Sequence, residues 1–114
     1  MTVSSLLSEE NTIYRTAVFK IPDTADFLWR SMDDAHVIYD ARSGHSQVLN
    51  DFAREILALI EDEPRDLEGL FKELEHILEI SLEADLKEQV LTTLVAFDKM
   101  GLIEPAVLQE EGKP

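Results

Sequence analysis

The chain has 114 residues, a length that predicts one domain with a single hydrophobic core and little room for a deep substrate cavity. Its 24 acidic residues against 10 basic ones give a net charge of -14, which opposes binding to the phosphates of nucleic acids and to anionic lipids. The hydrophobic fraction of 45% argues against a chain that is disordered throughout. The absence of cysteine excludes disulfides, thiolate metal sites and thiol chemistry.

Targeting and membrane signals are not visible in the sequence. The first basic residue is Arg15, and no apolar run follows the initial methionine, so no signal peptide is indicated. No run of apolar residues approaches the length that a transmembrane helix needs. We therefore expect a soluble, cytoplasmic protein without membrane association.

The N-terminal part divides into a polar opening and an alternating segment. Residues 1–11 are polar and small, and we expect them to be frayed. Over residues 13–21, the residue pattern repeats at every second position, as it does when successive side chains point to opposite sides of an extended chain. This predicts a strand that ends at Pro22.

Three short extended runs follow, and together they predict an antiparallel meander. They cover residues 27–30, 36–40 and 46–49, which are rich in strand formers. Residues 32–35 and 41–44 separate them, and each has the composition of a tight turn. Strands that are joined in this way pair with their neighbours in sequence order.

The apolar period then changes from two to that of a helix. Asn50 and Asp66 are good N-caps for two amphipathic helices. The first is expected to stop at the acidic run 61–63 and at Pro64, which cannot continue a helix. The second carries its apolar stripe over residues 67–78.

A third helix is expected from Ala84 or Leu86 to Met100, with Gly101 in the left-handed position that ends many helices. After it, the chain is expected to break at Glu104-Pro105. Strands followed by helices predict an α+β fold. The expected organisation is an N-terminal extension with a possible extra strand (1–26), a main domain (27–105) and a flexible acidic tail (106–114).

Motifs for catalysis or metal binding are weak. His36 and His45 bracket a hairpin and are able to approach each other, but a metal site would need Asp34 or Asp40 as a third ligand. His76 stands apart from both. Solvated turn histidines are the simpler interpretation, and we expect no metal ion.

Nucleophilic and phosphate-binding motifs are equally weak. Ser43 and His45 are close in a turn, but no nucleophile-elbow pattern surrounds them. The glycines are isolated, so no phosphate loop is indicated, and the carboxylates are expected on solvated helix faces. Trp29 is expected to pack against the core and not to anchor a site. We expect no enzyme activity and no cofactor.

The third predicted helix has an apolar arc that is wider than one packed face requires. On a helical wheel the arc covers about 220°, whereas a one-sided helix needs about 100° or somewhat more. Leu91 and Val95 form the surplus strip. Two explanations stay open: the N-terminal strand or the tail covers the strip, or the strip is the floor of a groove that binds a peptide by strand addition to a sheet edge.

An ordered set of short motifs runs along the chain: Trp29, VIYD at 37–40, SGH at 43–45, VLN at 48–50, and Ala53 with Ile56-Leu57, closing with GLI at 101–103. This set resembles the PqqD-like peptide chaperones, also called RiPP recognition elements because they act on ribosomally made, post-translationally modified peptides. The likeness covers residues 27–105. The stretch 37–50 is especially similar to the branch found beside HPr-kinase-related proteins.

The resemblance implies a winged-helix-like fold with a three-stranded antiparallel sheet followed by three helices. It also implies that a precursor leader peptide binds as an added strand beside the third strand of the meander, against the third helix. This selects the groove explanation for Leu91 and Val95. The implied peptide-binding residues are Ser46, Gln47, Val48, Leu49, Lys87, Glu88, Leu91, Val95 and Asp98.

The implied function is non-catalytic: the protein presents the peptide to a modifying enzyme, such as a radical SAM or kinase-related protein. The extension before residue 27 departs from the family, and it could pair with a sheet edge or occupy the groove. The negative charge suggests a basic leader or a basic partner. A free sheet edge also makes a homodimer plausible. The alternatives are a winged-helix transcriptional regulator, which the few cations of the third helix disfavour, and another protein–protein adaptor.

Overall fold

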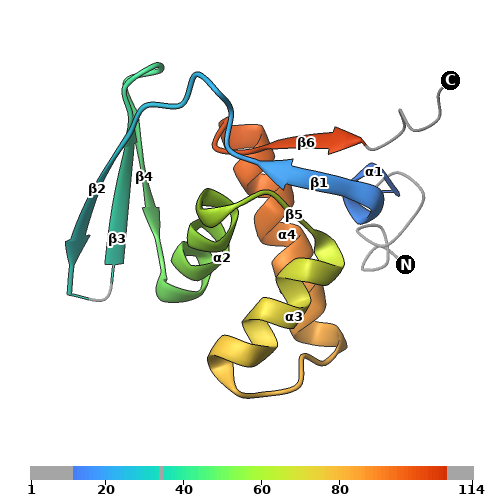
Figure 1. Ribbon diagram of the computed structural model, residues 1–114. Helices are drawn as coiled ribbons and strands as arrows, with labels where there is room; N and C mark the ends of the chain where they lie inside the picture. Colours follow the sequence, from blue (N-terminus) through green and yellow to red (C-terminus); the bar gives the residue numbers. More distant parts are fainter. Residues whose placement is uncertain (1–11, 34, 108–114) are drawn as a thin grey trace, which may run out of the picture.

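The computed structural model describes residues 12–33 and 35–107. In chain order its elements are α1 (Thr12–Thr16), β1 (Ala17–Lys20), β2 (Phe27–Met32), β3 (Ala35–Asp40), β4 (His45–Leu49), α2 (Asp51–Asp62), β5 (Arg65–Asp66), α3 (Leu67–Leu78), α4 (Ala84–Met100) and β6 (Glu104–Val107). Their arrangement is shown in Figure 1. The predictions for residues 1–11 and 108–114 lie outside the described residues.

The strands form two separate antiparallel sheets. One is the predicted meander in the order β2-β3-β4, and the other has the order β5-β1-β6. In the meander, positive φ angles at Asp33 (51°) and Gly44 (79°) allow the two tight turns. The α+β, winged-helix-like fold with a three-stranded antiparallel sheet followed by three helices is confirmed.

The helix boundaries agree with the predicted caps. The side chain of Asn50 accepts a hydrogen bond of 2.8 Å from the backbone N–H of Ala53, and Asp66 accepts one of 2.8 Å from Gly69. Gly101 closes α4 with a φ of 81°. The side-chain donors and acceptors of the sequence thus set where α2 and α3 begin, as predicted.

Two predictions for the ends of the chain are wrong, and one short strand in its middle was not predicted. Residues 13–16 belong to α1 and not to a strand, so the strand in this segment begins only at Ala17. The chain does not break at Glu104-Pro105, because these residues begin β6. Since β6 pairs only with β1 within the described residues, it is an edge strand, where a proline without an N–H is tolerated. The two-residue strand β5 was not predicted.

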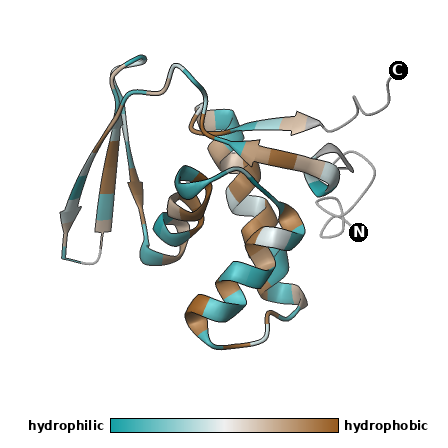
Figure 2. Ribbon diagram, in the orientation of Figure 1, coloured by the Kyte–Doolittle hydropathy of each residue, from teal (hydrophilic) through white to brown (hydrophobic). Residues whose placement is uncertain are grey.

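The core lies where α2, α3 and α4 meet β1 and the inner side of β3 and β4, and hydrophobic residues gather there in Figure 2. The segment set apart as an extension contributes to it, since Ala17 and Phe19 are fully buried. Among the described residues, no helix has both the length and the apolar character needed to cross a membrane. The largest fully buried side chains are Phe19, Phe97, Ile38, Ile56, Leu57, Ile60, Leu70, Leu74, Leu91, Leu94, Leu102 and Ile103.

Candidate functional site

The outer edge of β4 is the first feature of the candidate site. Within the described residues β4 pairs with β3 alone, so the backbone groups on its other edge have no strand partner. Ser46 and Val48 point to the exposed side of the sheet, and Val48 is 70% exposed. Gln47 is half-buried and Leu49 is buried on the inner side. An edge of this kind is a template for an added strand.

An ion pair between buried Asp40 and exposed Arg42 lies at the hairpin that leads into β4. Asp40 is 6% exposed and accepts three hydrogen bonds from Arg42: from the backbone N–H at 3.0 Å, from Nε at 2.9 Å and from Nη2 at 2.7 Å. These bonds to the guanidinium hold the pKa of the Asp40 carboxyl below its ordinary value. The pair therefore fixes the turn at the base of β4 through charge-assisted hydrogen bonds.

Arg42 also connects this hairpin to α4. Its Nη2 donates to the carbonyl oxygen of Gly101 at 2.8 Å, and its Nη1 donates to Thr24 Oγ1 at 3.2 Å. Gly101 directly follows the last residue of α4, so the start of β4 and the end of α4 are held at one point. We name Asp40, Arg42 and the Gly101 carbonyl the hairpin clamp.

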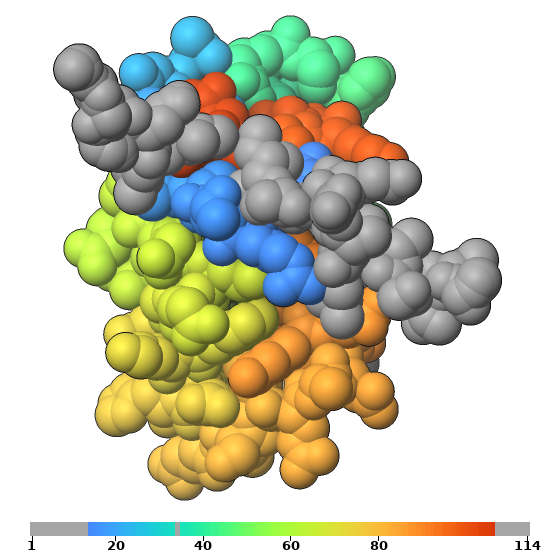
Figure 3. Space-filling model, turned by 90° about the vertical axis from the view of Figure 1, so that its right-hand side faces the viewer, coloured from blue at the N-terminus to red at the C-terminus, as the bar shows by residue number. Residues whose placement is uncertain are grey.

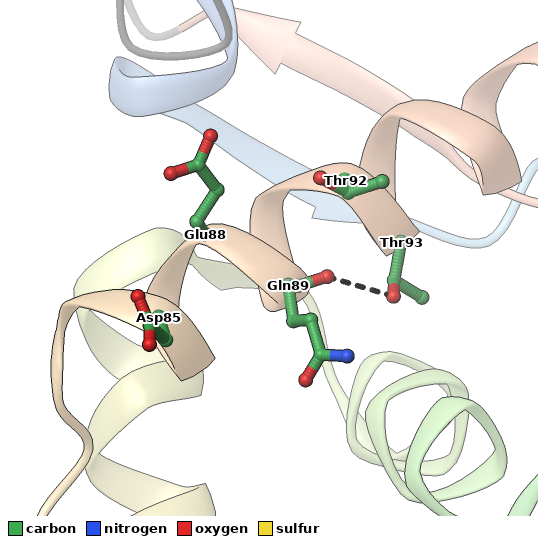
Figure 4. Close-up of a pocket in the computed structure, with 5 residues that line it drawn as sticks. All are labelled: Asp85, Glu88, Gln89, Thr92 and Thr93. Atoms are coloured by element: carbon green, nitrogen blue, oxygen red, sulfur yellow. Dashed lines mark hydrogen bonds between the residues drawn. The ribbon is translucent and has the colours of Figure 1, made fainter. Parts of the chain in front are cut away.

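The outer face of α4 carries the second feature, an open hollow of about 570 Å³. Figure 4 shows the five side chains that line it, all of them from α4. Gln89 and Thr93 lie on the side of the helix nearer to α2, the helix that contacts β3 and β4. The hydroxyl of Thr93 donates to the carbonyl oxygen of Gln89 at 2.8 Å. The lining is polar and acidic: Asp85, Glu88, Gln89, Thr92 and Thr93.

The prediction that Leu91 and Val95 form an open groove floor is wrong for Leu91. Its side chain is 1% exposed and lies beside Arg15 of α1 and Phe71 of α3. Val95 is half-buried. Figure 3 shows the α1–β1 segment lying across this side of the molecule, between β6 and the two helices α3 and α4. The structure therefore favours the other explanation for the strip, in which the chain's own N-terminal segment covers it.

The remaining helix residues of the predicted site also face this covered side. The hydroxyl of Tyr14 in α1 donates to Asp98 Oδ2 at 2.8 Å, and this hydrogen bond, together with partial burial, raises the pKa of Tyr14. Lys87 lies over the ring of Phe71, with its Nζ 5.3 Å from the ring centroid. Glu88 is half-buried and borders both the covered side and the outer hollow.

The structure thus separates the predicted site residues into two groups. Ser46, Gln47, Val48 and Leu49 lie on the free-edged strand β4, whereas Lys87, Leu91 and Asp98 lie where α1 and α3 pack on α4. Sequence reasoning missed Gln89, Thr92 and Thr93. Their polar character does not differ from that of any solvated helix face, so the sequence carried no signal for them.

Trp29 packs on α2, as predicted. Its indole N–H donates to Glu61 at 3.1 Å, and the guanidinium of Arg54 lies 3.9 Å from the centroid of its ring. Both partners belong to α2. Trp29 therefore joins β2 to the first helix after the sheet.

The histidines do not approach each other. In the ladder, His36 of β3 pairs with Leu49 and His45 of β4 pairs with Asp40, so the two histidines lie at opposite ends of the β3–β4 ladder. His36 contacts Ser31 at 2.9 Å and Asp51 at 2.7 Å through its two ring nitrogens. The described residues contain no group of three or more histidine, aspartate or glutamate side chains placed to hold a metal ion.

Comparison with known proteins gives a likeness of fold. No protein-family model matches the chain, and no curated protein matches its sequence. Among solved structures, the chain is similar to TbiB1 in complex with the TbiA(beta) leader peptide, with a TM-score of 0.57 and 23% sequence identity. The match covers 75% of this chain and 94% of that one. The two proteins share a fold, and membership of the PqqD-like family stays a prediction.

Proposed function

We propose that this chain is a non-catalytic, peptide-binding protein that captures the leader of a precursor peptide and presents it to a modifying enzyme. The observation that carries the proposal is the free edge of β4, held by the hairpin clamp at the end of α4. A guest peptide would add as a fourth strand to β4, with the outer face of α4 as the second wall. The likeness of fold to TbiB1, a protein solved with a leader peptide bound, supports this assignment.

The guest peptide is expected to be basic and extended. Asp85 and Glu88 border the outer hollow of α4, and the chain as a whole has a net charge of -14. A field of that sign steers cationic peptides toward the protein and repels acidic ones. Backbone hydrogen bonds to β4 would supply affinity, and side chains such as Gln89 and Thr92 would contribute selectivity.

The same charges disfavour DNA binding by a winged helix. Specific DNA-binding helices present cations to the phosphates. The hollowed face of α4 presents Asp85 and Glu88 instead, and Lys87 lies over the Phe71 ring. The transcriptional-regulator alternative would be revived by a gel shift that weakens with salt.

The test is a titration of the isotope-labelled protein with the leader of a precursor peptide encoded beside its gene, followed by amide NMR. We expect shifts at residues 46–49 and 89–93, and slower hydrogen exchange of the outer β4 amides, because strand addition gives those N–H groups acceptors. Flat shifts along β4 at saturating peptide would exclude strand addition.

Two substitutions at exposed positions test whether α4 forms a wall of the proposed peptide site. Gln89→Arg places a bulky cation in the outer hollow and is expected to weaken leader binding about tenfold. His76→Arg introduces the same side chain on the exposed surface of α3 and is expected to leave the Kd unchanged. Equal effects of the two variants would mean that α4 is not a wall of the site.

A further inference from the structure

The outer face of the β2-β3-β4 sheet is an exposed apolar surface that shares only β4 with the proposed peptide site. Side chains alternate along a strand, and Trp29, Ile38 and Leu49 take the inner side of this sheet. In Figure 1 the sheet stands at the left of the molecule, with α2 on its inner side. We name as the outer sheet face the opposite residues: Leu28, Arg30, Met32, Val37, Tyr39 and Val48.

These residues form one continuous patch across three strands. The ladder pairs Leu28 with Tyr39, Arg30 with Val37, and Val37 with Val48. Leu28 is 61% exposed and Met32 is 50% exposed. A shallow hollow of about 420 Å³ lies over the patch. Contiguous exposed apolar side chains on a small protein mark an interaction surface.

Charge defines the chemistry of a partner for this face. The outward ladder positions of β2, β3 and β4 carry no carboxylate, although the chain has 24 acidic residues. Their one charged side chain is Arg30, which lines the hollow and forms no ion pair within the described residues. A cation ringed by apolar side chains matches an apolar surface that carries a carboxylate.

The face of a sheet suits a folded partner better than an extended one. Backbone donors and acceptors of a sheet point along its plane, so an extended peptide gains hydrogen bonds at an edge and none on a face. A second copy of this chain fits poorly, because a contact between two such faces would offer no carboxylate to Arg30 and would join two molecules of charge -14.

We propose that the outer sheet face docks a folded partner protein whose surface places a carboxylate, among apolar side chains, on Arg30. The identification of that partner as the modifying enzyme rests on the proposed function. Because Ser46 and Val48 belong to β4, an enzyme docked on this face would lie next to a peptide on the β4 edge. Docking and peptide capture would then use adjacent, separate surfaces of one sheet.

The test uses two small probes with the same apolar body and opposite charge, phenylbutyrate and phenylbutylamine. We expect phenylbutyrate to shift the amides of residues 28–32 and to bind about fivefold more tightly than the amine, the scale of one exposed ion pair. Arg30→Glu should reverse this preference, and Arg30→Gln should abolish it. Lys72→Glu makes the same charge change on exposed α3 and should leave the preference intact.

Equal binding of both probes, or a preference that survives Arg30→Glu, would overturn the proposal. Sedimentation should give a monomer, and a dimer that Leu28→Glu dissociates would assign the face to a second copy instead. The leader titration is repeated on Arg30→Glu, where capture at β4 should persist. If the wild-type protein does not bind the leader, only the proposed function is refuted, because binding of the two small probes does not depend on leader binding.

Discussion

The two sheets of this protein have the same number of strands but differ in how much of each is exposed to solvent. In β5-β1-β6, the central strand β1 buries Ala17 and Phe19 completely and is paired on both sides. In β2-β3-β4, the inner side is buried, whereas one face and the edge of β4 are exposed. The first sheet packs on the side of α4, whereas the second leaves a strand edge and a face open to solvent, so two sheets with the same number of strands differ in what they leave available.

The position of the β5-β1-β6 sheet also explains why the edge of β4 in the other sheet has no strand partner among the described residues. The N-terminal segment brings α1 and β1 onto the side of α4 that holds Leu91 and Asp98. It pairs with β5 and β6, and none of its described residues pairs with β4. The segment that could have blocked the groove is thereby held on the other side of α4.

The largest effect that would test this contrast is the loss of Phe19. Phe19→Ala should lower the free energy of unfolding by about 3–5 kcal/mol, because it leaves a cavity under β1. The measurement is urea denaturation followed by circular dichroism. The matched variant Leu28→Ala in the open sheet should change it by about 0.5 kcal/mol or less, since Leu28 is exposed. A small effect of Phe19→Ala would show that β1 is a detachable extension.

Substitution of Leu91 is expected to have the next largest effect on stability. It tests whether the Leu91 and Val95 strip on α4 is covered or open to solvent. Leu91→Ala should cost about 2–5 kcal/mol of stability, because the side chain is buried beside α1 and α3. Val48→Ala on the exposed face of β4 should be nearly neutral in the same urea denaturation experiment. If Leu91→Ala is as mild as Val48→Ala, the strip opens in solution and the groove explanation returns.

Local signals explain how much of this fold was predictable from sequence. Asn50, Asp66 and Gly101 act within one helical turn, so the starts of α2 and α3 and the end of α4 followed from local residue chemistry. The meander followed from two short turns in the same way. The pairing of β1 with β6 joins segments more than 80 residues apart, and no local pattern specifies it.

The candidate site was predictable to the same extent. The resemblance implied a peptide beside residues 46–49, and within the described residues the outer edge of that strand, β4, has no strand partner. The binding role of these residues stays a prediction. The helix wall was not predictable, because an apolar strip on a helix has the same pattern whether solvent or another segment meets it. The pattern therefore left both explanations for Leu91 open, and the resemblance selected the groove, whereas Gln89 and Thr92 had no pattern to find.

The hairpin clamp should have a smaller effect on stability, and one that depends on pH. Arg42→Met leaves the Asp40 carboxylate without its guanidinium and should lower the Tm by about 5 °C near neutral pH. The folded-state pKa of Asp40 lies below its unfolded value, so the stabilisation is complete above the unfolded pKa and disappears as the pH falls through the folded one.

The thermal shift between wild type and Arg42→Met should therefore shrink in acid. Asp40→Asn serves as the control, because a neutral side chain removes the titration and should give a Tm difference with less dependence on acid pH. A shift that is the same at neutral and acidic pH would mean that the Asp40–Arg42 pair is not what Arg42→Met disrupts.

The smallest effect is expected at the contact that fixes α1 to α4. Tyr14→Phe removes the hydroxyl that donates to Asp98 but keeps the ring that stacks on Phe19, with the ring centroids 6.4 Å apart. The expected loss is about 0.5–1.5 kcal/mol, the usual net value of one hydrogen bond. Because Asp98 raises the pKa of Tyr14, this contribution is present below the ordinary tyrosine pKa and is lost as the pH rises through the folded value. Absorbance titration of the phenolate should show Tyr14 ionising at lower pH in Asp98→Asn than in the wild type, and an unchanged titration would mean that α1 does not rest on Asp98 in solution.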